Sequence, residues 1–420
     1  MKKTYQDFPA SFVCLFFIIS AVIICSRRID IIVNPQLWAE DGAIWLSTIY
    51  NQGFWTGILS PQNGYYQSIS RCSYGLGLLF GLQYAPLVAN VIAIAIRCSL
   101  AAFWVSKRFD FIDMKYRVLL TFYFLLMPNL AEGYVNITNA HWYLSLYLLS
   151  VLLANPASSF GGKFHDMLVL LLSALSGPFV IFITPCLAIK RYYERGGILA
   201  GLKKVNLFDI VMVLCFCVQF IAILTTSAGT RSPAPLGASI FGLFEILQNR
   251  VFLASFFDLS LILSWKPGHV AIIIFVLSNL AAILYFAFVG NWRVKISILF
   301  PVLMLSFALA KPMISDTQPQ WPPMINTAGG ERYFYLPNIF YFSFLLLIVS
   351  HLRNFKKTEN FIFLSVAVIF LYICPKYFFI YPHANLHYKE QIIRFEQLPS
   401  GEKMDIAITP PGWYMRLNKK

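Results

Sequence analysis

Apolar runs recur along this chain, and each run of about 20 residues is long enough to cross the roughly 30 Å hydrocarbon core of a bilayer as a helix. Clear examples begin at Tyr84, Leu207 and His269. Of the 420 residues, 58% are hydrophobic and only 12% are charged, whereas a soluble domain carries about 25% charged residues. The sequence therefore predicts an all-α protein that crosses a membrane several times.

Hydropathy and helix-breaking residues together predict about nine transmembrane helices. They are expected at 9–25, 84–105, 118–130, 142–154, 207–225, 269–289, 294–310, 336–351 and 361–374. The apolar segment 166–189 is different because Gly177 and Pro178 interrupt it near its middle. Proline lacks a backbone donor and glycine adds flexibility, so a straight helix is disfavoured there. Basic residues flank both of its ends, and a re-entrant hairpin with its tip at Gly177-Pro178 is expected.

These assignments divide the chain into a transmembrane domain, 1–374, and a polar and aromatic C-terminal tail, 375–420, that has no span of its own. Within the first part, two segments are long, polar and rich in aromatic residues, 26–74 and 311–335. Irregular backbone cannot face lipid, because its N–H and C=O groups would have no hydrogen-bond partners there. Both segments are therefore expected as loops at the membrane surface.

Basic residues are unevenly shared between the two sides of the predicted bundle. One side would carry Lys2, Lys3, Lys107, Arg108, Lys115, Arg117, Lys163, Lys190, Arg191, Arg195, Lys203, Lys204, Arg293, Lys295, Arg353, Lys356 and Lys357. The other side, before the tail, would carry Arg27, Arg28, Arg71, Arg231, Arg250, Lys266, Lys311 and Arg332. Because an excess of Lys and Arg marks cytoplasmic loops, the N-terminus is expected in the cytoplasm and the tail outside. This distribution also explains the net charge of +14 without a nucleic-acid partner.

The first external loop contains the sequence NPQLWAEDGAIW at 34–45, which sets two adjacent carboxylates, Glu40 and Asp41, between two tryptophans. Apolar neighbours indicate a partly buried site instead of a solvated surface. A carboxylate in such a place can take a proton from an attacking hydroxyl group. Either acid can have this role, and Asp41 is favoured because Gly42 allows a ligand to approach its backbone closely.

Further reactive groups lie in the segments expected outside. Candidate donor-phosphate ligands are Arg332 and Arg71, and candidate substrate-binding residues are Glu132, Asn139, His141, Trp142, Tyr333 and Trp413. An arginine fork binds phosphate bidentately, and aromatic rings stack on sugars as well as suiting the bilayer interface. The set suits sugar transfer from a lipid phosphate. Nucleotide-binding motifs and metal-ligand spacings are absent from the sequence, so no metal and no cofactor are expected.

Several stretches resemble one family in order and spacing. LWAEDGAIWLSTIYNQGFWTGILSPQNGYYQSISR (37–71) resembles the first external loop of bacterial membrane glycosyltransferases of the GT-C type. Later stretches are similar to further landmarks of that group: NITNAHWYL at 136–144, LSGPF at 175–179, ERYFYLP at 331–337 and PPGWYMRL at 410–417. Length, hairpin and external regions are similar to those of phage-type serotype-converting O-antigen glucosyltransferases.

The resemblance implies a GT-C-like fold and transfer of glucose from undecaprenyl-phosphate-glucose to lipid-linked O-antigen on the periplasmic side of a bacterial inner membrane. It implies an essential acid at Glu40 or Asp41, and a dependence on a separate flippase and donor synthase. One departure is Ser70, which precedes Arg71 where the family pattern has proline. Other classes stay open. A lipid-linked sugar flippase or transporter would place ionisable groups near the middle of the bilayer, and an O-antigen polymerase or membrane acyltransferase would share the external loops.

Overall fold

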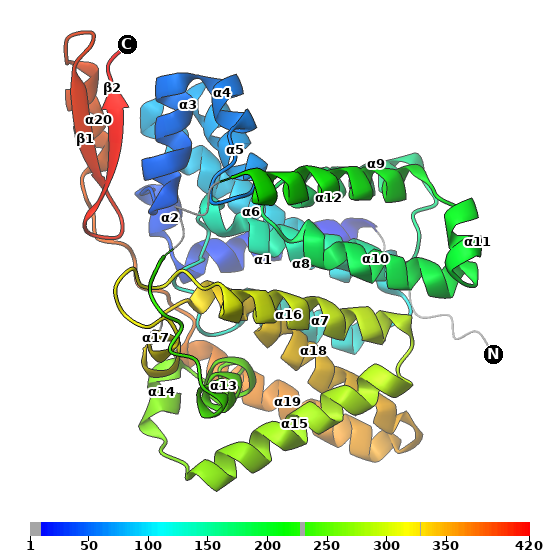
Figure 1. The fold of residues 1–420 in the computed structure, drawn as a ribbon. Helices are drawn as coiled ribbons and strands as arrows, with labels where there is room; N and C mark the ends of the chain where they lie inside the picture. Colours follow the sequence, from blue (N-terminus) through cyan, green and yellow to red (C-terminus); the bar gives the residue numbers. More distant parts are fainter. Residues whose placement is uncertain (1–9, 227–231, 328) are drawn as a thin grey trace.

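The computed structural model describes residues 10–226, 232–327 and 329–420. Pro9, Lys2, Lys3, Arg231 and the side chain of Arg353, all included in the predictions above, lie outside this description. The described chain is built almost entirely of helices (Figure 1). Seven of these helices are long and apolar enough to cross a membrane. The protein is thus a multi-pass membrane protein with an essentially all-α architecture, as predicted.

The long helices coincide with predicted spans. They are α1 (Ala10–Arg27), α6 (Ala85–Trp104), α12 (Leu207–Thr225), α15 (His269–Val289), α16 (Trp292–Ala310), α18 (Tyr335–His351) and α19 (Lys356–Lys376). The other two predicted spans correspond to α7 (Met114–Leu126) and α8 (Ala140–Leu153), which have only 13 and 14 residues. Each is shorter than the roughly 20 residues that a bilayer crossing requires. α7 ends earlier than predicted because Pro128 follows Met127, and a residue before proline leaves the helical region.

α8 is the central helix of the bundle. Every residue from Ala140 to Leu152 is buried. It packs between α6, α9 (Phe160–Ala174), α10 (Val180–Arg195), α16 and α18. A helix that is apolar on all sides and surrounded by other helices needs no lipid-facing surface, so α8 can hold polar residues at its first turn within the protein.

The predicted break in the segment 166–189 is present. α9 (Phe160–Ala174) and α10 run in opposite directions and meet at 175–179 (Figure 1), where Gly177 has a positive φ of 93°. The N–H of Gly177 donates to the carbonyl of Tyr66 at 2.8 Å. The Gln219 amide of α12 joins the same place, donating to the carbonyls of Tyr66 and Ala174. The tip of the hairpin is therefore held against the first loop.

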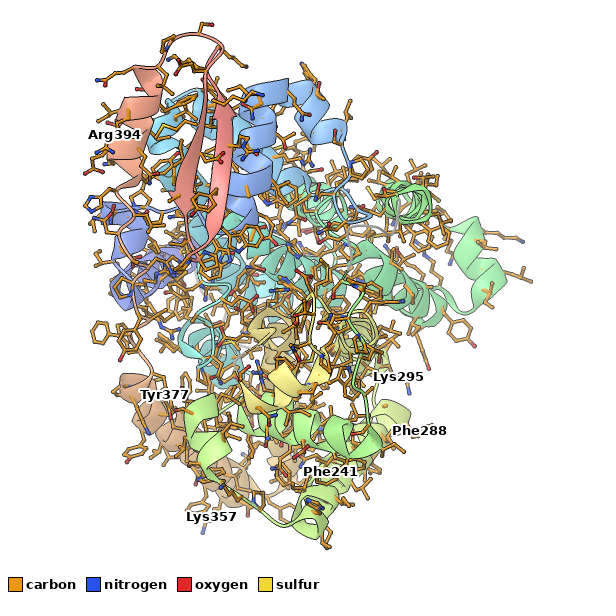
Figure 2. All side chains as sticks on the ribbon, turned by 60° about the vertical axis from the view of Figure 1, so that its left-hand side comes forward. Phe241, Phe288, Lys295, Lys357, Tyr377 and Arg394 are labelled. Atoms are coloured by element: carbon orange, nitrogen blue, oxygen red, sulfur yellow. The ribbon has the colours of Figure 1, made fainter. Side chains whose placement is uncertain are left out.

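The connecting segments gather at two opposite ends of the bundle. At one, which we call the basic end, Arg108 pairs with Asp166 at 2.9 Å, Lys115 pairs with Glu359 at 2.9 Å, and the Lys190 ammonium donates to the carbonyl of Leu152. Lys295 also lies here, close to Phe288 (Figure 2), and its ammonium group donates to the last carbonyls of α15 at Ala287 and Phe288. Basic residues from several separate connections therefore lie at the same end of the bundle.

The opposite end, which we call the loop end, carries the hairpin tip, the first loop and the tail. The first loop is partly helical, with α3 (Ser47–Gln52), α4 (Phe54–Leu59) and α5 (Ser68–Leu78). The first loop also contains α2 (Asp30–Val33), and short helices of the later connections lie here as well: α13 (Ile240–Ile246), α14 (Leu259–Ser264) and α17 (Trp321–Asn326). The connection at the other end between α10 and α12 contains α11 (Ile198–Lys203).

The tail folds into a small unit that the sequence did not predict. It consists of α20 (Tyr388–Glu396) and an antiparallel pair of strands, β1 (Lys403–Ile408) and β2 (Trp413–Asn418). The buried side chains of this unit are Tyr388, Ile392, Phe395, Ile406, Ile408, Met415 and Leu417. The unit packs on the first loop, since the Thr409 N–H and hydroxyl both donate to the carbonyl of Leu37, at 3.1 and 2.7 Å. Figure 2 shows Arg394 of α20 at the loop end, remote from Lys357 of α19.

Candidate functional site

Asp41 begins a π-helical turn, η1 (Asp41–Leu46), and only 2% of its surface is exposed. Its Oδ1 accepts the backbone N–H of Thr138 at 3.0 Å, and the Tyr74 hydroxyl also faces its carboxyl group. Burial, reinforced by the charge of Glu40, raises the pKa of Asp41 well above its usual range, against the opposing effect of these hydrogen bonds. A buried acid of raised pKa within a π-turn is typical of functional sites.

Gly42 has a different role from the one expected. A Cβ atom at this position would lie 2.8 Å from Cδ1 of Ile408 and 3.1 Å from Cδ1 of Leu37. The space beside the glycine is therefore filled by a side chain of the tail and is not left for a ligand. Gly42 is needed because β1 docks directly onto the turn that carries Asp41.

Glu40 is the more accessible acid of the pair. Its side chain is half-buried, and its carboxylate makes no hydrogen bond to any residue that the structure describes. Its charge acts on Arg332 across the loop end. Of the two adjacent carboxylates, one is therefore fully engaged by the protein and the other is available to a ligand.

Glu132 and Arg332, which are 200 residues apart, form an ion pair through Oε1 and Nη1. The backbone N–H of Arg332 also donates to Oε2 of Glu132 at 3.0 Å, and the N–H of Glu132 donates to Glu331 at 2.8 Å. Arg332 uses Nη2 for the carbonyl of Met313 and the hydroxyl of Tyr333. Most donors of the Arg332 side chain are therefore bonded within the protein, and the side chain links the loop of Glu132 to its own loop.

Arg71, in α5, is the opposite case. Only 2% of its surface is exposed, and neither Nε nor Nη1 has a hydrogen-bond partner among the described residues. Its guanidinium carbon lies 5.1 Å from the centre of the Trp45 ring. Burial lowers the pKa of Arg71 to about 10, so it stays charged at neutral pH. Burying a cation whose donors are unpaired costs free energy, and an anion that accepts hydrogen bonds from both nitrogens would offset that cost.

One face of α5 joins these groups. Gln67, Arg71 and Tyr74 follow the i, i+4, i+7 spacing of a helix face. Gln67 donates to the carbonyl of Thr138 at 2.9 Å, and the indole of Trp45 donates to the Thr138 hydroxyl at 2.9 Å. Asp41 and Arg71 are thus connected through Trp45 and Thr138. Neither Thr138, Gln67 nor Tyr74 was predicted as a site residue, although the spacing of Gln67, the N-cap of α5, with Arg71 and Tyr74 was visible in the sequence.

The histidine and tryptophan that begin α8 lie beside the hairpin tip. Nδ1 of His141 lies 2.6 Å from the carbonyl of Thr138 and 2.7 Å from the amide nitrogen of Gln67, so this nitrogen is engaged by the protein. Trp142 stacks edge-on against Phe179 at 4.6 Å and against Tyr333 at 5.8 Å. Its Nε1 has no hydrogen-bond partner within 10–226, 232–327 and 329–420. His141 therefore serves the protein, whereas Trp142 offers a donor to a ligand.

Two other predicted residues contribute little to this cluster. Asn139 donates from its amide to Oδ1 of Asn136 at 2.8 Å, which is a local loop contact. Trp413 lies in β2 opposite Ile408 and is 39% exposed. The structure thus brings Glu40, Asp41, Arg71, Glu132, His141, Trp142, Arg332 and Tyr333 together at the loop end. It places Trp413 on the outer surface of the tail.

Comparisons of this chain with protein-family models, with curated proteins and with solved structures found no match. The function must therefore be argued from the residues of the loop end themselves.

Proposed function

We propose that this protein is a membrane glycosyltransferase that moves glucose from undecaprenyl-phosphate-glucose to lipid-linked O-antigen. The observation that carries the proposal is the chain of contacts from the acidic pair to Arg71. Asp41 accepts the N–H of Thr138, the Thr138 hydroxyl accepts the indole N–H of Trp45, and the Trp45 ring lies beside Arg71. Transfer of a sugar from a lipid phosphate requires a base for the acceptor and a cation for the leaving phosphate. Both are present within one cluster at the end of a membrane bundle.

The same proposal orients the protein in a bacterial inner membrane with the basic end in the cytoplasm. An excess of Lys and Arg in short loops marks the cytoplasmic side. The loop end, with the acidic pair and the tail, is then periplasmic. There the phosphate of the donor would lie at the bilayer surface, and its sugar would lie among the loops.

We assign the base to Glu40 and an organising role to Asp41. The acceptor hydroxyl attacks the anomeric carbon of the donor sugar, its proton passes to Glu40, and the bond between that carbon and the phosphate oxygen breaks. The lipid phosphate leaves with the electron pair of that bond. Glu40 suits the role because its carboxylate is open, whereas Asp41 is buried and already accepts the N–H of Thr138.

The leaving phosphate is assigned to Arg71 in preference to Arg332. Two nitrogens of Arg71 are unused, and charge-assisted bonds from them would stabilise the developing negative charge. Arg332 is paired with Glu132, and this ion pair connects the two external loops. Trp142, with its unpartnered Nε1 beside Tyr333, is assigned to the sugar.

The direct test is expression of the chain in a bacterial host with a known O-antigen, together with a donor synthase and flippase, followed by sugar linkage analysis of the lipopolysaccharide. A new glucose branch that depends on Glu40 is the expected result. Unchanged linkages with the protein correctly inserted would contradict the proposal. A change in glycan chain length or acyl content instead would favour an O-antigen polymerase or an acyltransferase.

One observation favours a second function, transport of a lipid-linked sugar. Arg97 lies within α6, is 1% exposed, and has no hydrogen-bond partner for any guanidinium nitrogen among the described residues. It is enclosed by the rings of Tyr134 and Tyr143, at 4.9 and 4.7 Å. Ionisable groups inside membrane bundles often line transport paths. Reconstituted vesicles that move a labelled lipid-linked sugar without forming product would support this alternative.

A further inference from the structure

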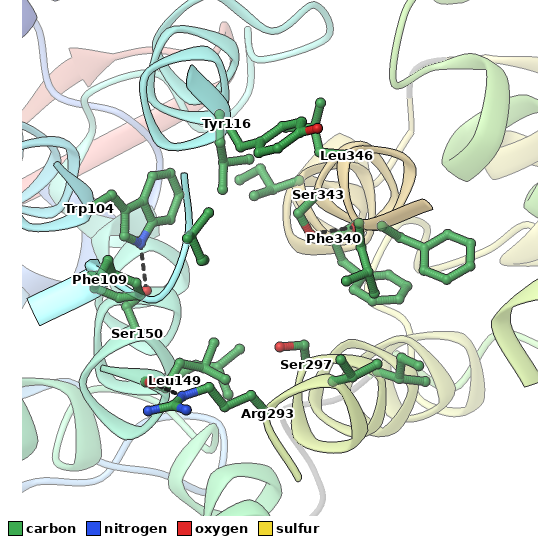
Figure 3. Close-up of a pocket in the computed structure, with 18 of the residues that line it drawn as sticks. Trp104, Phe109, Tyr116, Leu149, Ser150, Arg293, Ser297, Phe340, Ser343 and Leu346 are labelled. Carbon is green, nitrogen blue, oxygen red and sulfur yellow. Dashed lines mark hydrogen bonds between the residues drawn. The ribbon is translucent and has the colours of Figure 1, made fainter. Parts of the chain in front are cut away.

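A cavity of about 550 Å³ opens at the basic end and extends along α18 to Leu336, and neither acid of the pair lines it. Its walls come from α7 and the ends of α6 and α8 on one side and from α16 and α18 on the other (Figure 3). The volume is within the range of roughly 300–1,000 Å³ that is typical of ligand sites. None of the residues assigned to sugar transfer lines it, so it requires a separate explanation.

The cavity is long and mostly apolar. Along α18 its lining runs from Leu336 to His351, which corresponds to roughly 22 Å at about 1.5 Å per residue. Its hydroxyl groups are largely satisfied by their own helices, because Ser150, Ser343 and Ser350 donate to the carbonyls of Leu146, Phe340 and Leu347. A hydrocarbon chain can therefore occupy the cavity without leaving these hydroxyl groups unpaired. The length exceeds the roughly 15 Å depth of one leaflet of the hydrocarbon core.

The charged lining residues are basic. They are Arg117 and Arg293, and none of the described residues that line the cavity is a carboxylate. The exposed residues Asn291 and His351 are part of the lining, so the cavity reaches the surface at the basic end. The lining therefore carries the positive charges of two arginines, and the carboxylates of Glu194 and Asp110 act on Arg293 from outside the lining.

Arg293 is the residue best placed to bind a ligand at this opening. Its ring neighbours Phe111 and Trp292 lie 4.0 and 4.7 Å from the guanidinium carbon and hold the group in place. Nε donates to the carbonyl of Leu153 and Nη2 to Asn155, while Nη1 has no hydrogen bond to any part of the chain that the structure describes. Figure 3 shows Arg293 at the edge of the cavity, with Ser297 pointing into it.

We infer that this cavity holds one hydrocarbon chain of an anionic phospholipid of the adjoining leaflet, with the phosphate of its headgroup bound by Arg293. The long apolar interior fits the chain, and the basic opening fits the phosphate. The lipid-linked sugar donor is not the favoured occupant, since its phosphate would have to lie at the opposite end of the bundle. The phospholipid is thus a bound structural component that fills the space between α16–α18 and α6–α8.

The test compares lipids added to the purified full-length protein in detergent, with the midpoint of thermal unfolding as the readout. Dioleoyl-phosphatidylglycerol is expected to raise the midpoint by several degrees, and dioleoyl-phosphatidylcholine to raise it less. In Arg293→Gln the apparent affinity for phosphatidylglycerol should fall by about tenfold, as for the loss of one charge-assisted contact. Lys203→Gln, which removes an exposed charge of the same end outside the cavity, should leave the affinity unchanged.

Ser297→Phe provides a second variant that keeps Arg293 and its contacts to Leu153 and Asn155. Its ring would occupy the cavity, so co-purified phospholipid detected by native mass spectrometry should be lost. Equal stabilisation by both lipids, equal loss in Lys203→Gln, or lipid retention in Ser297→Phe would each overturn the inference. A larger, Arg293-dependent effect of undecaprenyl phosphate would also overturn it, by identifying a carrier lipid as the occupant. None of these readouts depends on glycosyl transfer.

Discussion

Ile408, in the last strand pair of the chain, lies against Gly42, the residue after the buried acid Asp41. The segments that carry these two residues are joined by the hydrogen bonds of Thr409 to Leu37. The C-terminal tail therefore forms part of the wall that holds the first loop in place, and the position of the acidic pair depends on residues from both ends of the sequence.

Replacing Gly42 by Val is expected to weaken the docking of the tail by about 1–3 kcal/mol, because overpacking a filled space has that cost. The tail should become more sensitive to limited proteolysis. Adding Ile408→Ala should restore part of the loss, since it removes two of the three atoms nearest to the added Cβ and leaves Cδ1 of Leu37. Gly161→Val is the control, because a Cβ at Gly161 meets no atom within 4 Å. Equal effects of the two glycine variants would contradict this account.

Glu40→Gln is expected to lower the rate of glucose transfer by about 10²–10⁴-fold, as for the loss of a general base. Asp41→Asn should have a smaller effect, because an amide oxygen can still accept the N–H of Thr138. Turnover with a purified lipid-linked donor and acceptor provides the measurement. Asp405→Asn, at an exposed acid of the tail, is the control. A larger loss in Asp41→Asn than in Glu40→Gln would exchange the two roles.

Arg71→Gln is expected to reduce kcat by about 10²–10³-fold, because the cation that stabilises the leaving phosphate is removed. Arg71→Lys should recover part of the activity, since the charge returns without the planar fork. Arg416→Gln, which removes an exposed arginine of β2, serves as the matched control. Wild-type kinetics in Arg71→Gln would show that the phosphate is bound elsewhere.

Docking of the tail should also depend on pH through His383, which stacks on Trp38 at 4.7 Å. Burial, followed by the nearby charge of Arg28, lowers the pKa of His383 to about 4. The unfolded histidine titrates near 6.5. The unfolded state therefore binds the proton more readily, and stability is fully present above pH ~6.5 and is lost as the pH falls towards 4.

Thermal unfolding between pH 4 and pH 7 tests this expectation. The slope of stability with pH should be smaller in His383→Gln than in the wild type. His387→Gln, at an exposed histidine of the same tail, is the comparison variant. If the slope is the same in all three proteins, His383 is not the titrating group.

Local features of the sequence were sufficient to predict the membrane helices and the broken hairpin. Hydropathy is a property of neighbouring residues, and Gly177-Pro178 disfavours a continuous helix wherever it occurs. The short α7 and α8 were predicted as spans because periodicity reports apolar character but not whether a helix faces lipid or protein. α8 is enclosed on all sides, so its 14 residues need not match the thickness of a bilayer.

The candidate site was predicted only in part. Glu40 and Asp41 stood out because two adjacent carboxylates are unusual in so apolar a chain. The partners of each group, however, depend on contacts between residues far apart in the sequence, such as Glu132 with Arg332 and Asp41 with Thr138. Which acid is buried, which arginine is already paired and what fills the space beside Gly42 were decided by the packing of the tail and the loops. The sequence by itself determined the helices, because their burial in lipid follows from local composition, and only the tertiary structure decided which polar groups were left without a partner.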